Sequence, residues 1–351
     1  MWPTKEFPGY GSFVKNVVDG LNENEIYCSH FAIIGGRATS TIDKLAKYIN
    51  FYFKILYNYF RKYDFIYVHF PNQALPILIP LYSVFKKRII INLHGEDLLY
   101  KKQGLSLILG KLNDWFMRRV DAIIVPSHYY KNRTLERINC CPDKIFVSPS
   151  GGINPNSFYC EDLNITIKDE LHLGYVGRID PNKGWQQFID TLKLLPKDFK
   201  YQATIIGNGS QVTTLINELK SINSSCIQYV PHVFQQDLRR YYSSFDLLIF
   251  PTMREEESLG LVGIEAMACG TPVIGSNIGG IPSYLISGYN GFLVQPGKVD
   301  EIVEYIIYFS RLDQYERYRM RQNCISLSKH YYASNVLSSL ATFIKEQITN
   351  K

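Results

Sequence analysis

The sequence predicts an α/β protein built from two consecutive doubly wound domains. Its 351 residues suffice for two hydrophobic cores, and a composition of 46% hydrophobic and 20% charged residues is typical of a soluble globular protein. Strand-like apolar runs alternate with helical stretches, which favours parallel sheets. A turn-rich segment, 150–158, separates two such series. We therefore expect one domain over residues 1–155 and a second over residues 156–330.

Each half contains five apolar runs that we predict to be strands, with helices between them. In the first half they are EIYCSHFAII (25–34), DFIYVHF (64–70), RIIINLHG (88–95), DAIIVPS (121–127) and KIFVSPS (144–150). In the second half they are HLGYVGR (172–178), YQATIIG (201–207), CIQYV (226–230), DLLIFPT (246–252) and TPVIGS (271–276). The end of the chain, 331–351, has a helical pattern.

The first domain departs from the usual doubly wound order, which opens with a central strand. Only Met1–Pro3 and a few polar residues precede a glycine-containing loop and a helical stretch. About five buried apolar side chains, at about 1.5–3 kcal/mol each, would be lost with such a strand, which rivals the stability of a domain. We therefore expect that the first strand is missing and that this chain is a truncated form.

Charge is unevenly distributed along the chain. Residues 1–155 carry 20 Lys and Arg against 12 Asp and Glu, whereas residues 156–351 carry 18 against 20. The basic half is expected to face an anionic partner. No apolar run is long enough to span a bilayer, and no secretory signal opens the sequence. Seven cysteines without metal-ligand spacing predict reduced thiols in a cytoplasm and no metal site.

The most informative segment is 254–280, REEESLGLVGIEAMACGTPVIGSNIGG, which lies mostly between two predicted strands. A strand, a loop, a helix and a second strand form a βαβ unit, whose ligands sit against the helix N-terminus. The free amides at Gly260, Leu261 and Val262 favour an anion there, such as phosphate.

Two carboxylates, Glu257 and Glu265, flank this predicted anion site. Carboxylates repel anions but accept hydrogen bonds from hydroxyl groups, so the pair predicts the ribose and the sugar of a sugar nucleotide. The alternative is a solvated acidic run before an ordinary buried helix. Gly209, in a Gly-Asn-Gly turn after a strand, would let the nucleotide approach closely, although an ordinary turn explains it equally well.

Two cations, Arg178 and Lys183, follow the first strand of the second half. They could clamp a diphosphate whose negative charge grows as it leaves. Two solvated loop cations are the alternative. No Asp-x-Asp pair, which would hold a divalent ion on a diphosphate, occurs in the sequence. We therefore expect these cations and helix dipoles to replace a metal.

The segment from Glu257 to Ile274 resembles the donor-binding signature of the GT-B glycosyltransferases of family 4, Glu-x7-Glu followed by a helix of small residues. The resemblance covers nearly the whole chain and is strongest from His172 to Pro296. It implies the GT-B fold, in which two Rossmann-like domains face each other across a cleft and the C-terminal helix 331–351 packs back on the first domain.

The resemblance also implies roles for individual residues. Arg178 and Lys183 would bind the donor diphosphate, Glu265 the ribose and Glu257 the sugar. The donor would be a UDP- or GDP-linked sugar, with no other cofactor. His232 replaces a common glycine near the expected base pocket, which leaves the base open.

Three residues of the first half belong to the implied site. Gly9 and Gly11 would let a loop approach the donor phosphates. His94, at a predicted strand end and before a glycine, would hydrogen-bond the sugar or position the acceptor; a histidine satisfied by loop carbonyls is the alternative. His69 also ends a predicted strand, and we interpret it as structural.

Two aromatic stretches, 42–62 and 104–119, carry basic residues at their edges. They could lie on an anionic bilayer, as the acceptor domains of relatives often do, or they could pack on the sheet of their own domain. The sequence favours neither. No nucleic-acid-binding motif is present.

The predicted function is therefore retaining glycosyl transfer to a glycan or lipid-linked acceptor in surface or extracellular polysaccharide biosynthesis, in the cytoplasm or at the inner face of the membrane. In the retaining chemistry that the resemblance implies, attack and departure share one face of the sugar. Two alternatives stay open: a nucleotide-sugar epimerase of the same fold, and a noncatalytic or truncated subunit that only binds a sugar nucleotide.

Overall fold

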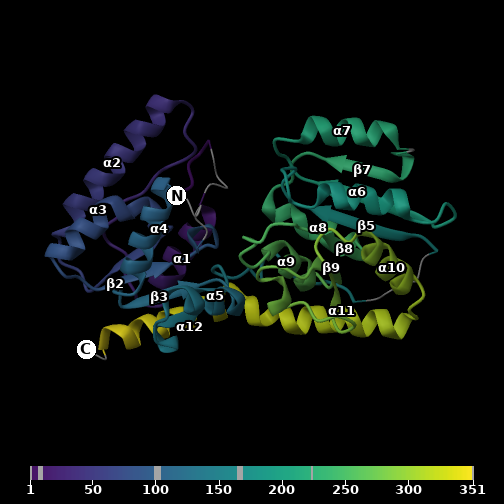
Figure 1. The fold of residues 1–351 in the computed structure, drawn as a ribbon. Helices are drawn as coiled ribbons and strands as arrows, with labels where there is room; N and C mark the ends of the chain where they lie inside the picture. Colours follow the sequence, from purple (N-terminus) through teal and green to yellow (C-terminus); the bar gives the residue numbers. More distant parts are fainter. Residues whose placement is uncertain (1, 7–10, 99–103, 164–168, 223, 350–351) are drawn as a thin grey trace. The chain divides into compact units, whose positions relative to one another are not determined.

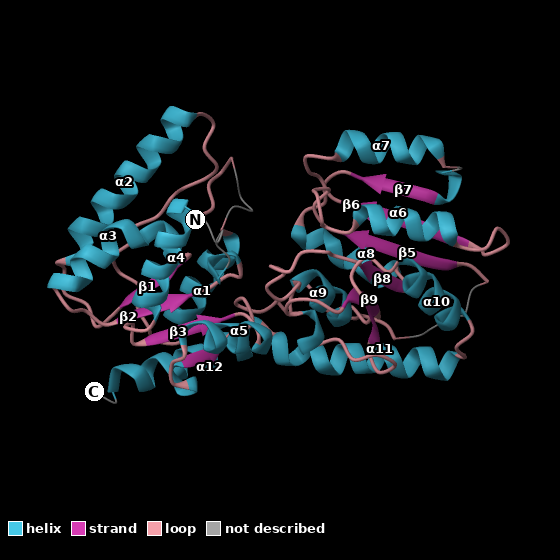
Figure 2. Ribbon diagram, in the orientation of Figure 1, coloured by secondary structure: helices cyan, strands magenta, loops and turns pink. Residues whose placement is uncertain are grey.

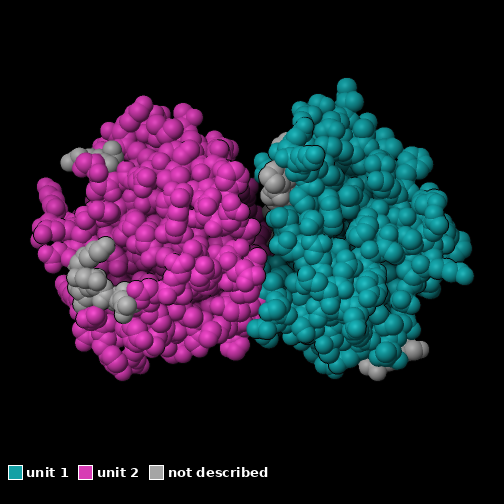
Figure 3. All heavy atoms as spheres, turned by 180° about the vertical axis from the view of Figure 1, so that it is seen from behind, with its two compact units in different colours: residues 1–152, 333–351 teal, residues 153–332 magenta. Residues whose placement is uncertain are grey.

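The structure is a computed structural model that describes residues 2–6, 11–98, 104–163, 169–222 and 224–349. Two compact units make up the chain (Figure 3). Unit 1 comprises Met1–Gly152 and Ala333–Lys351, and unit 2 comprises Ile153–Tyr332. The first crossing between the units falls inside the turn-rich segment 150–158.

Unit 1 alternates helices and strands (Figure 1). Its elements are α1 (Ser12–Glu23), α2 (Thr41–Tyr59), β1 (Ile66–His69), α3 (Pro71–Val84), β2 (Ile89–Asn92), α4 (Gly104–Met117), β3 (Ala122–Val125), α5 (His128–Ile138), β4 (Ile145–Val147) and, from the end of the chain, α12 (Ala333–Thr349). The strands form one parallel sheet in the order β1-β2-β3-β4.

Helices cover both faces of this sheet, because its central strands are apolar on both sides. Ile89 and Ile91 of β2 join the core formed with α2, α3 and α4. Ile90, between them, joins a second core with α1 and α12. The C-terminal helix therefore belongs to unit 1, where Leu340 and Ile344 are fully buried.

The strand predicted for residues 25–34 is wrong. Residues 26–34 form no strand, and the only bridge of this region among the described residues joins Gly35 to Trp2. Tyr27 and Phe31 are exposed, so the apolar run does not lie in the sheet. A strand needs a partner whose backbone groups pair with its own, and an apolar composition does not supply one.

Unit 2 is continuous in sequence. Its elements are β5 (Leu171–Val176), α6 (Trp185–Leu194), β6 (Tyr201–Ile206), α7 (Val212–Ser221), β7 (Ile227–Val230), α8 (Leu238–Ser244), β8 (Leu247–Phe250), α9 (Leu261–Ala268), β9 (Val273–Ser276), β10 (Gly291–Val294), α10 (Val299–Ser310) and α11 (Gln314–Ser328). Short 3-10 turns join several of them. The strand β10 was not predicted.

The sheet of unit 2 is parallel in the order β10-β9-β8-β5-β6-β7 (Figure 2). The chain builds outward from β5 through β6 to β7, then returns to place β8 on the other side of β5. Such a reversal of strand order leaves a crevice at the carboxyl ends of the two strands, where ligands of open α/β sheets bind. The loops after β5 and β8 occupy this position.

No described helix has the length and hydropathy that crossing a bilayer requires.

The packing of α12 in unit 1 can be tested with Leu340→Ala. This side chain is fully buried against α1 and the sheet, so its truncation is expected to lower the free energy of unfolding by about 2–5 kcal/mol. Urea denaturation followed by circular dichroism measures the change. Ser338→Ala, at an exposed position of the same helix, is expected to change it by less than about 0.5 kcal/mol. Equal effects of the two substitutions would contradict this packing.

Candidate functional site

A pocket of about 370 Å³ lies in unit 2 between the loops that follow β5 and β8. Seven of the eight candidate residues of the second half line it: Arg178, Lys183, Glu257, Gly260, Leu261, Val262 and Glu265. Gly207, Asn208 and His232 line it as well. Gly209 does not, since it lies in the turn beyond, where its amide hydrogen-bonds the Asn208 side chain at 2.7 Å.

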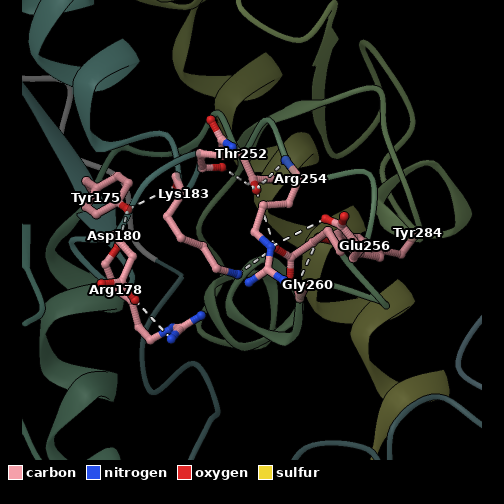
Figure 4. A network of polar contacts seen from close by, with 11 residues as sticks. Tyr175, Arg178, Asp180, Lys183, Thr252, Arg254, Glu256, Gly260 and Tyr284 are labelled. Atoms are coloured by element: carbon pink, nitrogen blue, oxygen red, sulfur yellow. Dashed lines mark hydrogen bonds and ion pairs between the residues drawn. The ribbon is translucent and has the colours of Figure 1, made fainter. Parts of the chain in front are cut away.

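Lys183 and Glu257 form an ion pair at one side of this pocket. Lys183 Nζ lies 2.9 Å from Glu257 Oε2, and both side chains are largely buried. Thr252 Oγ1 donates to the same carboxylate oxygen at 3.3 Å. Figure 4 shows Lys183 reaching from the loop after β5 toward the residues of the loop after β8. The two loops are thus joined by opposite charges.

Arg178 is the more exposed of the two cations. Its Nη1 lies 2.9 Å from Asp180 Oδ2, and about half of its side chain is accessible (Figure 4). Asp180 also accepts from the backbone and hydroxyl of Ser210, each at 2.8 Å. These hydrogen bonds, first that of the Ser210 backbone, hold the pKa of Asp180 below its usual value. The ionised Asp180 in turn orients Arg178 at the rim of the pocket.

The shape of the loop after β8 depends on two glycines. Gly260 precedes α9 with φ 75°, and a Cβ there would lie 2.6 Å from the Phe250 ring. Gly279 has φ 56°, and its Cβ would lie 2.2 Å from the carbonyl oxygen of Glu257. Any larger residue at either position would displace the loop that carries Glu257.

The N-terminus of α9 opens onto the pocket. Gly260, Leu261 and Val262, which all line it, supply the backbone of the first turn. Amides of a first turn have no acceptor within the helix and carry a partial positive charge. Together with the two cations they make this end of the pocket suited to an anion.

Glu265 lies at the other side of the pocket, on the following turn of α9. It is 7% exposed and accepts hydrogen bonds from Tyr242 Oη at 2.9 Å and Gln235 Nε2 at 3.4 Å. Burial raises the pKa of this carboxyl to about 7, although both hydrogen bonds act in the opposite direction. Hydroxyl groups of a ligand that donate to it would favour its ionised form.

Unit 1 contains a second cluster of candidate residues, at the carboxyl ends of β1 and β2. His69 Nδ1 lies 3.0 Å from His94 Nε2, and the two rings stack at 5.3 Å. His94 also packs against Phe13 and Phe70, and its backbone N–H donates to Asp97 at 2.9 Å. Gly11 precedes α1 with φ 75°, whereas Gly9 lies outside the described residues.

Both histidines of this pair are neutral at physiological pH. Burial lowers the pKa of His69 to about 3, and burial followed by the neighbouring His69 lowers the pKa of His94. One ring therefore donates to the other and fixes its tautomer. His69 was predicted to be structural, and its contact with His94 was not predicted. The signal available was that His69 is the last residue of β1 and that His94 lies two residues after the end of the neighbouring parallel strand β2.

Among the described residues, no three His, Cys, Asp or Glu side chains are grouped as metal ligands.

Each of the two units matches a family of known glycosyltransferases. The family described as "Glycosyl transferases group 1" matches residues 164–327, and "Glycosyltransferase Family 4" matches residues 19–152. Together these matches cover most of the chain.

Two relatives show how far the similarity extends. An uncharacterized glycosyltransferase of Methanocaldococcus jannaschii is 28% identical over 220 residues, which is 62% of this chain and 57% of that protein. The N-acetyl-alpha-D-glucosaminyl L-malate synthase of Bacillus anthracis is 23% identical over 288 residues, 80% of this chain and 74% of that protein. The chain thus spans just over half of the first relative and about three quarters of the second.

Among solved structures, Anabaena HepE in complex with UDP has a TM-score of 0.73 at 17% identity and covers 98% of each chain. This likeness and the two parallel sheets confirm the predicted GT-B fold.

The raised pKa of Glu265 predicts a pH dependence of stability. Between pH 4.5 and about 7 the folded chain holds a proton on Glu265 that the unfolded chain releases, so this group's contribution to stability falls as the pH rises. Glu265→Gln removes this loss. Between about pH 5 and about pH 8, the free energy of unfolding of Glu265→Gln is expected to rise relative to that of wild type by at most about 3 kcal/mol.

The measurement is urea denaturation across this pH range. Glu304→Gln replaces an exposed carboxyl on α10 and serves as the control. A pH-dependent difference of the same size in the control would refute the assignment to Glu265.

Proposed function

Because the chain belongs to glycosyltransferase family 4, we propose that it transfers a sugar from a nucleoside-diphosphate sugar to an acceptor hydroxyl with retention of configuration. The observation that carries this proposal is the pocket of unit 2, where Lys183 and Glu257 pair beside the first turn of α9 and Glu265 lies on its next turn. The cationic end of the pocket suits the diphosphate of such a donor, Glu257 suits its sugar and Glu265 suits its ribose.

The diphosphate is proposed to bind at the first turn of α9, with Arg178 and Lys183. An ammonium group has three donors, so Lys183 can contact a phosphate while it keeps its bond to Glu257. Glu257 is then next to the phosphate and can accept hydrogen bonds from the sugar. Glu265 would accept from the ribose hydroxyls. The arrangement supports a donor that lies along α9 from ribose to sugar.

In the proposed reaction the bond from the sugar C1 to the diphosphate oxygen breaks, and a bond from C1 to the acceptor oxygen forms on the same face. The proton of the acceptor hydroxyl passes to the leaving phosphate. Arg178, Lys183 and the amides of α9 would stabilise the charge that develops on that phosphate. We propose that they do so without a metal ion.

The proposal also assigns a role to His94, a donor class and an acceptor class. His94 is assigned to hydrogen bonding with the sugar or acceptor, since its ring is neutral and held by His69. A UDP-sugar is the first donor to test, because the similar Anabaena structure contains UDP; a GDP-sugar is the alternative. The acceptor is proposed to be a glycan or lipid-linked intermediate of surface polysaccharide synthesis.

Donor binding can be tested by thermal unfolding with UDP and GDP. At about 100 times its dissociation constant, the correct nucleoside diphosphate should stabilise the protein by about 2.7 kcal/mol. Glu265→Ala should lose most of this shift, because the ribose hydroxyls lose their acceptor. Glu218→Ala removes an exposed carboxylate that pairs with Lys193 outside the pocket and should keep the shift. Shifts that are equal in both variants would contradict the assigned site.

Transfer itself can be tested by following the release of nucleoside diphosphate. The donor is a sugar linked to the nucleoside diphosphate that binds in the preceding test, and extracts supply the acceptor. Lys183→Ala is expected to lower kcat by roughly 10²–10³, since it removes a cation at the developing charge. Lys193→Ala is the matched control and should leave kcat unchanged.

The products separate the alternatives. A retaining transferase gives a glycoside with the donor's anomeric configuration, which nuclear magnetic resonance detects, together with free nucleoside diphosphate. An epimerised nucleotide sugar without nucleotide release would indicate an epimerase instead. Binding without any turnover would indicate a noncatalytic subunit.

A further inference from the structure

A buried hydroxyl group lies beneath the loop 177–184, which carries both cations of the pocket and which we call the cation loop. Tyr175, on β5, is 1% exposed, and its ring lies 5.8 Å from the Phe188 ring of α6. Its Oη donates to the carbonyl oxygen of Arg178 at 3.2 Å and to that of Lys183 at 3.1 Å. A phenol has one hydrogen, so the two carbonyls share it. One side chain therefore holds both ends of the cation loop (Figure 4).

Tyr175 faces the core rather than the pocket. Neighbouring residues of a strand point to opposite faces of the sheet. Val176 accordingly lines the pocket, whereas Tyr175 joins the hydrophobic core with Trp185 and Phe188. Tyr175 is absent from the described lining of the pocket. Any effect of its hydroxyl on a ligand therefore passes through the cation loop.

The cation loop lacks the support of a regular element. Residues 177–184 lie in neither a helix nor a strand. Asn182 has φ 62° and Gly184 has φ 90°, and a Cβ on Gly184 would lie 2.5 Å from the Pro251 carbonyl group. Such left-handed residues build tight turns, in which no repeating hydrogen-bond ladder sets distances along the chain. The Tyr175 hydroxyl bridges the loop from one end to the other.

This bridge joins two cations whose ionic partners lie on different elements. Arg178 pairs with Asp180 of the cation loop, and Lys183 pairs with Glu257 of the loop after β8. Each ion pair fixes the end of one side chain but not the distance between the two backbones. A diphosphate carries its charges at a fixed spacing, so both cations contribute fully only when their own spacing matches.

We propose that Tyr175 is a positioning residue for the donor diphosphate, whose hydroxyl sets the spacing of Arg178 and Lys183. The proposal rests on the diphosphate site proposed for unit 2 and adds a residue that the ligand does not touch. Burial, followed by the charges of Glu257 and Asp180, raises the pKa of Tyr175, so the hydroxyl keeps its hydrogen at neutral pH. Its expected signature is a loss of affinity that depends on the second phosphate.

The test is calorimetric titration of the full chain with UDP and UMP, or with GDP and GMP where GDP is the nucleotide that stabilises it. Tyr175→Phe keeps the ring in the core and removes one oxygen atom. The preference for diphosphate over monophosphate is expected to fall roughly 3–10-fold, as for the loss of one ordinary hydrogen bond. Affinity for the monophosphate should change much less, because a single phosphate does not need both cations at a fixed spacing.

A double-mutant cycle distinguishes positioning from a general loosening of unit 2. In Lys183→Ala, one of the two cations is already absent, so Tyr175→Phe should have little further effect on binding of the diphosphate. Losses that simply add would show that the hydroxyl does not act through Lys183 and would overturn the proposal.

Tyr82→Phe is the matched control. Tyr82 is 7% exposed in unit 1, and its hydroxyl donates to the Arg119 carbonyl oxygen at 2.9 Å. This variant should keep the full preference for the diphosphate. Circular dichroism and thermal unfolding establish that each variant is folded, and titrations are made below the unfolding temperature of the least stable one.

The outcomes separate this proposal from the proposed function. A diphosphate preference that Tyr175→Phe retains in full, or that Tyr82→Phe loses equally, would overturn the role of Tyr175 and leave the diphosphate site intact. A wild type that binds diphosphate and monophosphate equally, or binds neither, would overturn both.

Discussion

The parallel pairing of β5 with β8 is the contact on which the unit 2 site depends. Its register joins Leu173 to Leu247 and Gly174 to Leu248, so both strands end at the same edge of the sheet. The loop of Lys183 and the loop of Glu257 therefore leave the sheet side by side. The positions of the ion pair, the first turn of α9 and Glu265 follow from this one adjacency.

The cations of the pocket have ionic partners within unit 2. Lys183 is held by Glu257, and Arg178 is held by Asp180, which two hydrogen bonds from Ser210 fix in turn. Such partners keep long side chains from sampling other rotamers, so less entropy is lost when an anion arrives. Among the described residues, the Glu265 carboxyl has no ionic partner of this kind, and burial raises its pKa to about 7.

The sequence predicted those parts of the fold and site that depend on local order. The loop and helix from Glu257 to Glu265 are contiguous, and the cations after β5 could be placed beside them because both follow strands of one parallel sheet. The pairing of His69 with His94 was missed, since it depends on which strands are neighbours. The strand at 25–34 failed for the same reason: an apolar run does not show whether a partner strand lies beside it. β10 was not predicted, although its four residues equal the length of β8 and of β9.

The division of the chain has a consequence for the order in which it folds. Unit 2 is one uninterrupted segment, whereas unit 1 is completed by α12, whose Leu337, Leu340 and Ile344 close the core beside α1. During synthesis the ribosome releases unit 2 whole while the apolar faces of α1, β2 and β3 still lack their cover. Unit 1 is therefore translated in large part before unit 2 but completes its core after unit 2. The apolar faces of α1, β2 and β3 would need protection in the nascent chain until α12 emerges.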